Sequence, residues 1–330
     1  TLNISAVESP RGRIGLAMAL PAGQTFEAGS REIIILQFAQ RTAAQPADAP
    51  FAFGFGDRPV AREVASADAR PLQSDFTIAS KAARAIATVS AASFMEGELA
   101  PGQIATAFGE HLTAHTETAP FSPLPAELGG AKVIVTDSAG VARPSPLFFV
   151  SPGQINFLIP VETALGTATI TVTCADGAVS VGVISVTKTA PSLFAANGDG
   201  QGAAAAVLLR IRPDLSRSVE PVVVFDGARN GFVASPIDLG APDDQVFLIC
   251  FGTGLSAWSS DQKPLPPFMG LKATVEEAQV EATYAGPQDE FMGLDQINLR
   301  LPRSLAGSGE VEVAITVNGI RSNVVRVKIK

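Results

Sequence analysis

An internal repeat is the feature that most constrains this chain. Segment 104–112 (IATAFGEHL) matches segment 247–255 (FLICFGTGL), so that Gly109 aligns with Gly252. Further anchors follow in the same order: Pro-Leu-Pro at 123–125 and 264–266, Gln-Ile-Asn at 154–156 and 296–298, and Gly166 and Gly309. Because these four anchors keep their spacing to within two residues, we expect two copies of one fold in the C-terminal two-thirds of the chain.

The rhythm of apolar residues inside the copies predicts strands. Ala168, Ile170 and Val172 alternate with threonines, which indicates a strand with one buried and one solvated face and points Cys174 inward. The run 246–251 is apolar throughout and predicts a strand covered on both faces. Glycine and proline break such runs about every ten residues, which is the rhythm of an immunoglobulin-like sandwich.

Several strings in the two copies resemble a known family. They are 101–109 (PGQIATAFG), 123–130 (PLPAELGG), 149–157 (FVSPGQINF), 251–255 (FGTGL) and 293–298 (GLDQIN). Over roughly residues 88–330 the chain is similar to the uncharacterised "Solibacter C-terminal" domain of secreted acidobacterial proteins. The resemblance implies a C-terminal module of large exported, multidomain surface proteins, for which no enzymatic activity is established. Extra alternating segments between Asn197 and Gly240 depart from the pattern and predict a β-meander between the two sandwiches.

The first eighty residues carry a different resemblance. Segments 12–21 (GRIGLAMALP), 26–31 (FEAGSR) and 55–60 (FGDRPV) resemble the later strands of a cohesin-type, jelly-roll-like β-sandwich. The expected fold class is therefore all-β, with tandem immunoglobulin-like β-sandwiches after an N-terminal cohesin-like β-sandwich. The expected plan is 1–80 partial cohesin-like sandwich, 81–190 first sandwich, 191–240 connecting meander and 241–330 second sandwich.

A partial N-terminal sandwich leaves a sheet edge uncovered, because its apolar runs 14–20, 33–38, 51–55 and 76–78 lack upstream strands. We expect an extended segment to complete such an edge in a neighbouring copy, which would build a filament, or the missing strands to lie upstream in a longer protein. The candidate assembly strand consists of Thr1, Leu2, Asn3, Ile4, Ser5, Ala6 and Val7.

Composition and charge exclude several classes of protein. Apolar residues make up 46% of the chain and charged residues 17%, which excludes a disordered chain. The net charge of −8 disfavours nucleic-acid binding, and the apolar runs are too short for a membrane span. Cys174 and Cys250 fall in different predicted sandwiches, so we expect both thiols to be free and buried.

Three motifs imitate cofactor or metal sites, and each has a plainer interpretation. Segment 252–257 fits the dinucleotide pattern G-x-G-x-x-A, but prolines follow where a helix should start. Segment 197–202 begins like a calcium loop, but Leu208 stands where the bidentate Glu should be. His111 and His115 lie four apart in an expected loop without further ligands. We therefore expect no cofactor and no metal, and a solvated face for the basic alternation that ends the chain.

The repeated amides are the candidate site residues, together with Gly109 and Gly252. Gln154 and Asn156 share one strand face, as do Gln296 and Asn298. Because the motif occurs in both copies, we expect a structural role, in which the amides hydrogen-bond a neighbouring loop backbone within each sandwich.

Three classes of function follow from these features. The first is a non-catalytic structural or adhesive protein that is secreted or on the bacterial cell surface, with protein partners and self-assembly into an oligomer or filament. The alternative is a carbohydrate-binding module, although Trp258 and Tyr284 are the sole Trp and Tyr available as sugar platforms. The third class, an enzyme, has no catalytic constellation in its favour, so we expect no enzymatic activity.

Overall fold

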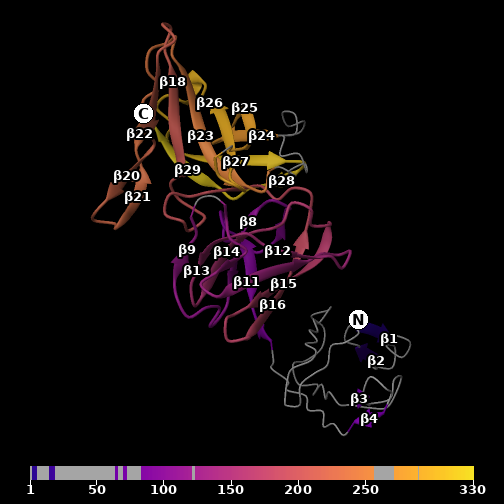
Figure 1. Ribbon diagram of the computed structural model, residues 1–330. Helices are drawn as coiled ribbons and strands as arrows, with labels where there is room; N and C mark the ends of the chain where they lie inside the picture. Colours follow the sequence, from indigo (N-terminus) through magenta and orange to yellow (C-terminus); the bar gives the residue numbers. More distant parts are fainter. Residues whose placement is uncertain are drawn as a thin grey trace. The chain divides into compact units, whose positions relative to one another are not determined.

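The computed structural model describes residues 2–5, 15–18, 64–65, 70–72, 83–120, 123–255, 271–288 and 290–330. The chain forms two compact units, 1–82 and 83–330. The fold is all-β: apart from the short 3₁₀ turn η2 (Arg303–Leu305), every named element in the described residues is a strand (Figure 1). In this described part, no helix has the length and apolarity to cross a membrane.

Two strand pairs are described in the N-terminal unit. β1 (Leu2–Ser5) pairs antiparallel with β2 (Gly15–Met18) of the same chain, and β3 (Val64–Ala65) pairs with β4 (Pro71–Leu72). The strand predicted over 14–20 is therefore present as β2. The predicted strands over 33–38, 51–55 and 76–78 lie outside the described residues, as do Thr1, Ala6 and Val7 of the candidate assembly strand.

The first sandwich of the C-terminal unit packs a seven-stranded sheet on a five-stranded one. The larger sheet holds β5 (Arg84–Ala85), β7 (Glu98–Leu99), β10 (Glu127–Leu128), β11 (Ala131–Thr136), β12 (Ala142–Pro144), β15 (Gly166–Thr173) and β16 (Val179–Val186). The smaller sheet holds β6 (Ala87–Ser90), β8 (Ile104–Phe108), β9 (Glu117–Thr118), β13 (Leu147–Val150) and β14 (Gln154–Leu158). Ala168, Ile170 and Val172 of β15 point into the buried core, as their alternation predicts.

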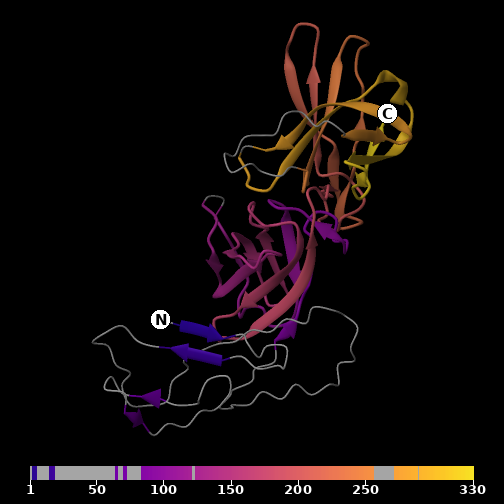
Figure 2. The same ribbon diagram turned by 90° about the vertical axis from the view of Figure 1, so that its right-hand side faces the viewer.

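The second sandwich is built from one eleven-stranded sheet that folds over itself. Its strands are β17 (Ser192–Leu193), β18 (Ala206–Ile211), β19 (Arg217–Pro221), β22 (Pro236–Ile237), β23 (Gln245–Thr253), β24 (Lys272–Val275), β25 (Ala278–Pro287), β26 (Asp295–Arg300), β27 (Gly309–Val317), β28 (Ile320–Arg321) and β29 (Val325–Ile329). β25 pairs with β24 through its first residues and with β26 through its last, so it passes between the two layers. In Figures 1 and 2 this orange and yellow sandwich follows the magenta one along the chain.

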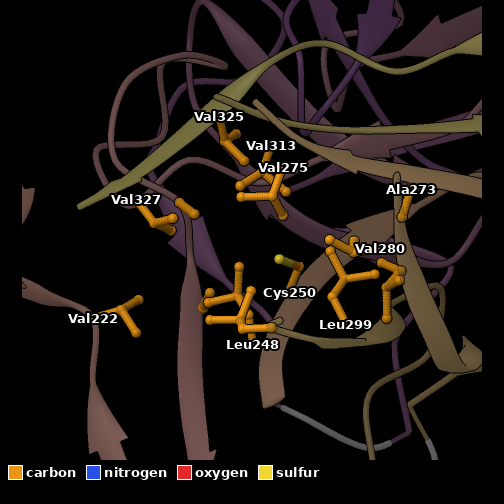
Figure 3. Close-up of a cluster of buried hydrophobic side chains, with 14 of the residues drawn as sticks. Val222, Leu248, Cys250, Ala273, Val275, Val280, Leu299, Val313, Val325 and Val327 are labelled. Atoms are coloured by element: carbon orange, nitrogen blue, oxygen red, sulfur yellow. The ribbon is translucent and has the colours of Figure 1, made fainter. Parts of the chain in front are cut away.

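The core of the second sandwich lies between these layers (Figure 3). Val246, Leu248 and Cys250 of β23 are buried there, opposite valines such as Val313 and Val325. The alternate residues Phe247, Ile249 and Phe251 are only half-buried, so the expectation that 246–251 is covered on both faces is wrong. These side chains lie on the outer face of the sheet.

The internal repeat extends to strand register. Ala107 pairs with Ile155 in the first sandwich, and Cys250 pairs with Ile297 in the second. The segment expected to connect the sandwiches belongs to the second one, because β18 pairs with β23 and β22 pairs with β29. Between them, β20 (Val223–Asp226) and β21 (Gly231–Ala234) form a separate two-stranded hairpin that projects from the sandwich (Figure 1).

Candidate functional site

The repeated amides lie on the outer face of a sheet in each sandwich. In the first, Ile155 and Phe157 of β14 are fully buried, while Gln154 and Asn156 face outward and are half-buried. Gln154 Nε2 donates to Asn156 Oδ1 at 2.8 Å, and the Thr106 hydroxyl donates to the same oxygen at 3.0 Å. The two amides are therefore bonded along their own strand.

The second sandwich repeats this arrangement. Gln296 Nε2 donates to Asn298 Oδ1 at 2.9 Å, and Ile297 and Leu299 of β26 are fully buried. The expectation that these amides bind a neighbouring loop backbone is not met in the described residues, where their side chains bind each other and, in one copy, Thr106. The reason is geometric, because side chains two residues apart on one strand face are close enough to bond directly.

Aromatic side chains flank both amide pairs. Phe108 lies across from Gln154, and Phe251 lies across from Gln296. On the other side of each amide strand, Phe149 is across from Asn156 and Tyr284 is across from Asn298. We call the two sets amide–aromatic face 1 (Phe108, Phe149, Gln154, Asn156) and amide–aromatic face 2 (Phe251, Tyr284, Gln296, Asn298).

Each face has hydrogen-bonding groups to spare. Within the described part of the chain, Gln154 and Gln296 keep Oε1 as an acceptor, and Asn156 and Asn298 keep Nδ2 as a donor. A neighbouring acceptor and donor match a hydroxyl group, which both donates and accepts, and the flanking rings offer an apolar surface. The arrangement can therefore bind a polyhydroxylated ligand, and the one titratable side chain among these eight residues, Tyr284, donates its hydroxyl to the carbonyl of Pro287 at 2.6 Å.

Gly109 and Gly252 allow close packing beside these faces. A Cβ on Gly109 would lie 2.7 Å from Cγ2 of Ile86, and a Cβ on Gly252 would lie 2.6 Å from the carbonyl oxygen of Ser192. The repeated glycine thus lets a neighbouring segment cross β8 or β23 closely. The predicted turn after β23 occurs at Gly254, whose φ is +81°. Ser256 and Ala257 of the dinucleotide-like motif lie outside the described residues.

A buried polar junction joins the two sandwiches. Thr253 of the second sandwich is fully buried, accepts a hydrogen bond from the N–H of Ile104 at 3.0 Å and donates to the carbonyl of Gly293 at 2.7 Å. Gln103, also fully buried, accepts from the N–H of Ala100 at 2.7 Å and donates to the carbonyl of Ala190 at 3.2 Å. This junction was not predicted, because its partners are far apart in sequence.

The junction also requires a residue without a side chain. Gly293 has a φ of +77°, and a Cβ there would lie 2.5 Å from Cδ1 of Leu158 and 2.8 Å from Cγ1 of Ile104. A larger residue would therefore push the first sandwich away from the second. Tight packing and satisfied buried hydrogen bonds together fix the contact.

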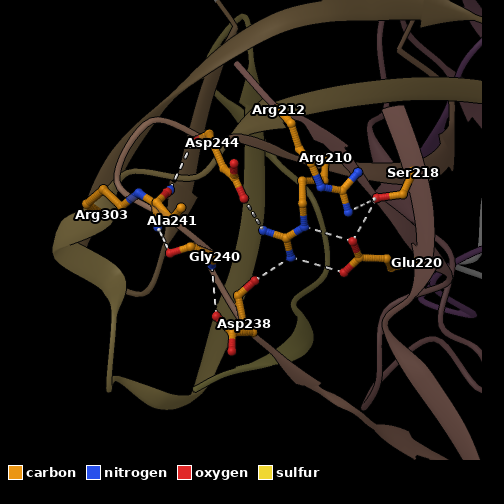
Figure 4. A network of polar contacts seen from close by, with 9 residues as sticks. All are labelled: Arg210, Arg212, Ser218, Glu220, Asp238, Gly240, Ala241, Asp244 and Arg303. Carbon is orange, nitrogen blue, oxygen red and sulfur yellow. Dashed lines mark hydrogen bonds and ion pairs between the residues drawn. The ribbon is translucent and has the colours of Figure 1, made fainter. Parts of the chain in front are cut away.

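A network of ion pairs and hydrogen bonds surrounds Arg210 (Figure 4). Its buried guanidinium donates two hydrogen bonds to Glu220, at 2.8 and 3.1 Å, one to Asp244 at 3.4 Å and one to the carbonyl of Asp238 at 2.6 Å. The bond to Glu220 raises the pKa of Arg210 further and lowers the pKa of the Glu220 carboxyl. Arg303 binds the carbonyls of Gly240, Ala241 and Asp244 nearby.

Sequence analysis missed Arg210, although a signal was present. Ala206, Leu208 and Arg210 alternate along β18 and all point inward. A charged side chain that points inward from a strand needs a buried partner of opposite charge. The inward position of Arg210 therefore predicts a buried ion-pair network around it. The network ties β18, β19 and the segment before β23 together, which is a structural role.

The two motifs that imitate a metal site, segment 197–202 and the pair His111 and His115, show no arrangement of metal ligands in the described residues. The Asn197 side chain binds the backbone of Phe232, and Asp199 caps the N–H of Gln201 at 3.2 Å. His111 and His115 are exposed in a loop. In the described residues, no group of three or more His, Cys, Asp or Glu side chains is placed to hold a metal ion.

The basic residues at the end of the chain lie on a solvated face, as predicted. Arg326 lies 3.5 Å from both Glu310 and Glu312, and Lys330 lies 3.3 Å from Asp238. Each of these side chains is more than half exposed. Pairs of this kind contribute little to stability.

Comparison with known proteins identifies no family. No family model matches the chain, and no curated protein matches it. Among solved structures, the chain is similar to SGBP-B of the Bacteroides ovatus mixed-linkage glucan utilization locus, in complex with a mixed-linkage heptasaccharide. The identity is 12% and the TM-score 0.29, over 70% of this chain and 43% of that one. This chain therefore spans less than half the length of that protein.

Proposed function

We propose that this protein is a non-catalytic structural or adhesive protein, secreted or on the cell surface. The observation that supports the proposal is the junction of Thr253, Gln103 and Gly293, which couples two sandwiches through buried hydrogen bonds and a glycine contact. A structural protein must transmit force between its domains, and a fixed junction does this better than a flexible linker. The net charge of −8 also fits this proposal, because an acidic surface repels nucleic acids.

Coupled unfolding tests the structural role. In hydrogen exchange followed by mass spectrometry, we expect strands of both sandwiches in the intact chain to lose protection together, because opening one exposes the buried junction of the other. Thr253→Val should uncouple them, whereas Thr167→Val, on an exposed position of β15, should not. Independent loss of protection in the unmodified chain would contradict the structural role. Turnover of any substrate in a hydrolase panel would contradict the non-catalytic one.

Carbohydrate binding is the second candidate function. The observation that favours it is the duplication of the amide–aromatic face, with an acceptor and a donor that bind no other group of the described residues, and with flanking rings in each copy. A glycan array tests it, with Asn156→Ala and Asn298→Ala as variants that each remove one donor. We expect each variant to weaken binding and the double variant to abolish it. Full binding by the double variant, or no binding by the unmodified chain, would exclude these faces as sugar sites.

Self-assembly through the N-terminal strand remains part of the proposal. β1 pairs with β2 of its own chain and has a second edge that pairs with no other described strand. An extra strand from another copy could add to that edge. Deleting residues 1–8 and measuring the mass by light scattering tests the idea. If the unmodified chain is monomeric, or if the deletion leaves its assembly unchanged, this strand does not mediate assembly.

A further inference from the structure

The β20–β21 hairpin exposes three large apolar side chains to solvent. Val224 is 53% exposed, Phe225 is 55% exposed and Phe232 is 42% exposed. The two phenylalanine rings pack edge to face, with their centroids 5.6 Å apart, and this is the cross-strand pair of the hairpin. Two isolated strands are marginally stable in water, and such exposed side chains mark an interaction surface.

Hydrogen bonds show which edge of the hairpin is open. Asn197 binds both the N–H and the C=O of Phe232, so these groups point away from β20. Phe225 and Phe232 are thus a non-hydrogen-bonded pair, and by the alternation of an antiparallel ladder the N–H and C=O of Phe225 and Val223 point to the other side of β20. The N–H of Ser235 donates to the carbonyl of Val222, so Val222 faces β21 with its backbone groups. Because Val223 is the next residue, its backbone groups face the other way, as this assignment requires. In the described residues β20 pairs with β21 alone.

Other sheet edges of the C-terminal unit are protected. A charged residue or a proline occurs in each of β5, β7, β9, β10, β12, β19, β22 and β28. Charges and prolines on edge strands prevent pairing with other chains. The edge strands β6 and β17 lack both, but Val89 and Ser90 of β6 and both residues of β17 are buried. β20 also ends on a charged residue, Asp226, but it differs because the residues before it, Val222 to Phe225, form an uninterrupted apolar run along an open edge.

We infer that β20 pairs antiparallel with β20 of a second copy of this chain, which joins two hairpins into one four-stranded sheet. The outward groups of Val223 and Phe225 allow a register in which Val223 of each copy is across from Phe225 of the other and the two Val224 residues meet at the twofold axis. Every cross-strand pair in the centre is then apolar. This inference goes beyond the proposed function, because neither a structural role nor sugar binding requires it.

The arrangement of charges on the hairpin fits a second copy as the occupant. In this register Asp226 is across from Val222 of the other copy, so the two Asp226 carboxylates do not meet. Asp226 is also paired with Arg229 of its own tip, at 3.5 Å, which reduces repulsion between the hairpins. The contact is small compared with the roughly 800 Å² per partner of a stable interface, so the dimer forms reversibly as concentration rises.

Disulfide trapping of the full chain tests the register. A non-hydrogen-bonded pair brings Cβ atoms to about 4.5–5.5 Å, so Val224→Cys should form a covalent dimer under mild oxidation. Val219→Cys is the matched control, because Val219 is also a strand valine and is 66% exposed. The native Cys174 and Cys250 are buried and should not interfere. We expect Val224→Cys to form the dimer at least tenfold faster than Val219→Cys, and equal rates would overturn the inference.

Sedimentation velocity over a concentration series gives an independent readout. The unmodified chain and Val219→Lys should both shift toward the dimer mass as concentration rises. Phe225→Lys should lose this dimer, because it places a lysine on the open edge of each β20 strand, whereas deleting residues 1–8 should remove only assembly through β1. A monomeric unmodified chain at every concentration, or dimerisation of Phe225→Lys equal to that of the unmodified chain, would overturn the inference. Neither outcome bears on the coupled unfolding or the glycan array described above.

Discussion

The side-chain amide of Asn197 binds both backbone groups of Phe232, as a neighbouring strand would. Its Oδ1 accepts the N–H of Phe232 at 2.7 Å, and its Nδ2 donates to the C=O of the same residue at 2.9 Å. This pair of bonds satisfies the outward backbone groups of Phe232 and holds the hairpin against the loop at 197–202. The residue that begins the calcium-like motif is therefore a support for the hairpin.

Replacing Asn197 should loosen the hairpin without unfolding the sandwich. Asn197→Ala removes both bonds, and Asn197→Asp removes the donor while retaining the acceptor. Each bond at this exposed site contributes about 1 kcal/mol, so we expect faster hydrogen exchange at Phe232, with the larger effect in Asn197→Ala. Exchange in β27 should be unchanged. Unaltered exchange at Phe232 in both variants would contradict the supporting role of Asn197.

Removing Arg210 should destabilise the second sandwich strongly. Arg210→Met keeps much of the volume but leaves the carboxylates of Asp244 and Glu220, which are 10% and 35% exposed, without their cation. Breaking such a buried pair costs about 3 kcal/mol or more, measured as the free energy of unfolding in urea. Arg326→Met, which removes an exposed arginine with two weak pairs, should change stability by less than about 1 kcal/mol. A similar small effect for both would show that the network is not important.

Acid should destabilise the first sandwich through Asp137. Its carboxylate accepts the N–H of Ala164 at 3.1 Å, the N–H of Val141 at 3.0 Å and a hydrogen bond from Arg143 at 2.5 Å. These bonds, led by that of Ala164, lower the pKa of Asp137 from 3.8 to about 2. Because the folded pKa is the lower one, this contribution to stability is complete above about pH 4 and is lost as pH falls toward 2.

The pH dependence can be measured with a matched pair of variants. Asp137→Asn should be less stable than the unmodified chain at pH 7, and its free energy of unfolding should fall less steeply between pH 4 and 2. Asp199→Asn, at an exposed turn, should leave the slope unchanged. If Asp137→Asn and the unmodified chain have equal slopes over this range, Asp137 does not govern the acid response.

The repeat and the strand phases could be predicted from the sequence because they are local or periodic. Gln154 and Gln296 are on strands and face outward as the alternation predicts, since a period of two decides which face a side chain takes. Alternation does not specify a partner across space. The amide pairing, the junction at Thr253 and the cations around Glu220 depend on which strands are neighbours, and that is decided by the packing of the whole sheet.

The β20–β21 hairpin is a second feature that periodicity predicts only in part. The alternating segments between Asn197 and Gly240 predict strands, but periodicity alone does not indicate that 223–234 leaves the sheet and projects. Which strands join a sheet depends on neighbours that are distant in sequence, and a period of two does not specify them.

The two cysteines should be free and unreactive in the folded protein. Both are free and buried. Burial raises the pKa of Cys250 to about 12, so almost no thiolate forms there near neutral pH. The Cys174 Sγ lies 2.9 Å from the carbonyl oxygen of Leu112, to which the thiol donates. Titration with a thiol reagent at pH 8 should therefore find two thiols in denatured, unreduced protein and, in native protein, no reaction of Cys250 until it unfolds. Cys250→Ala should leave one thiol in the denatured titration. A count of zero in the denatured, unreduced chain would require a disulfide between the two sandwich cores, which the fold described here does not allow.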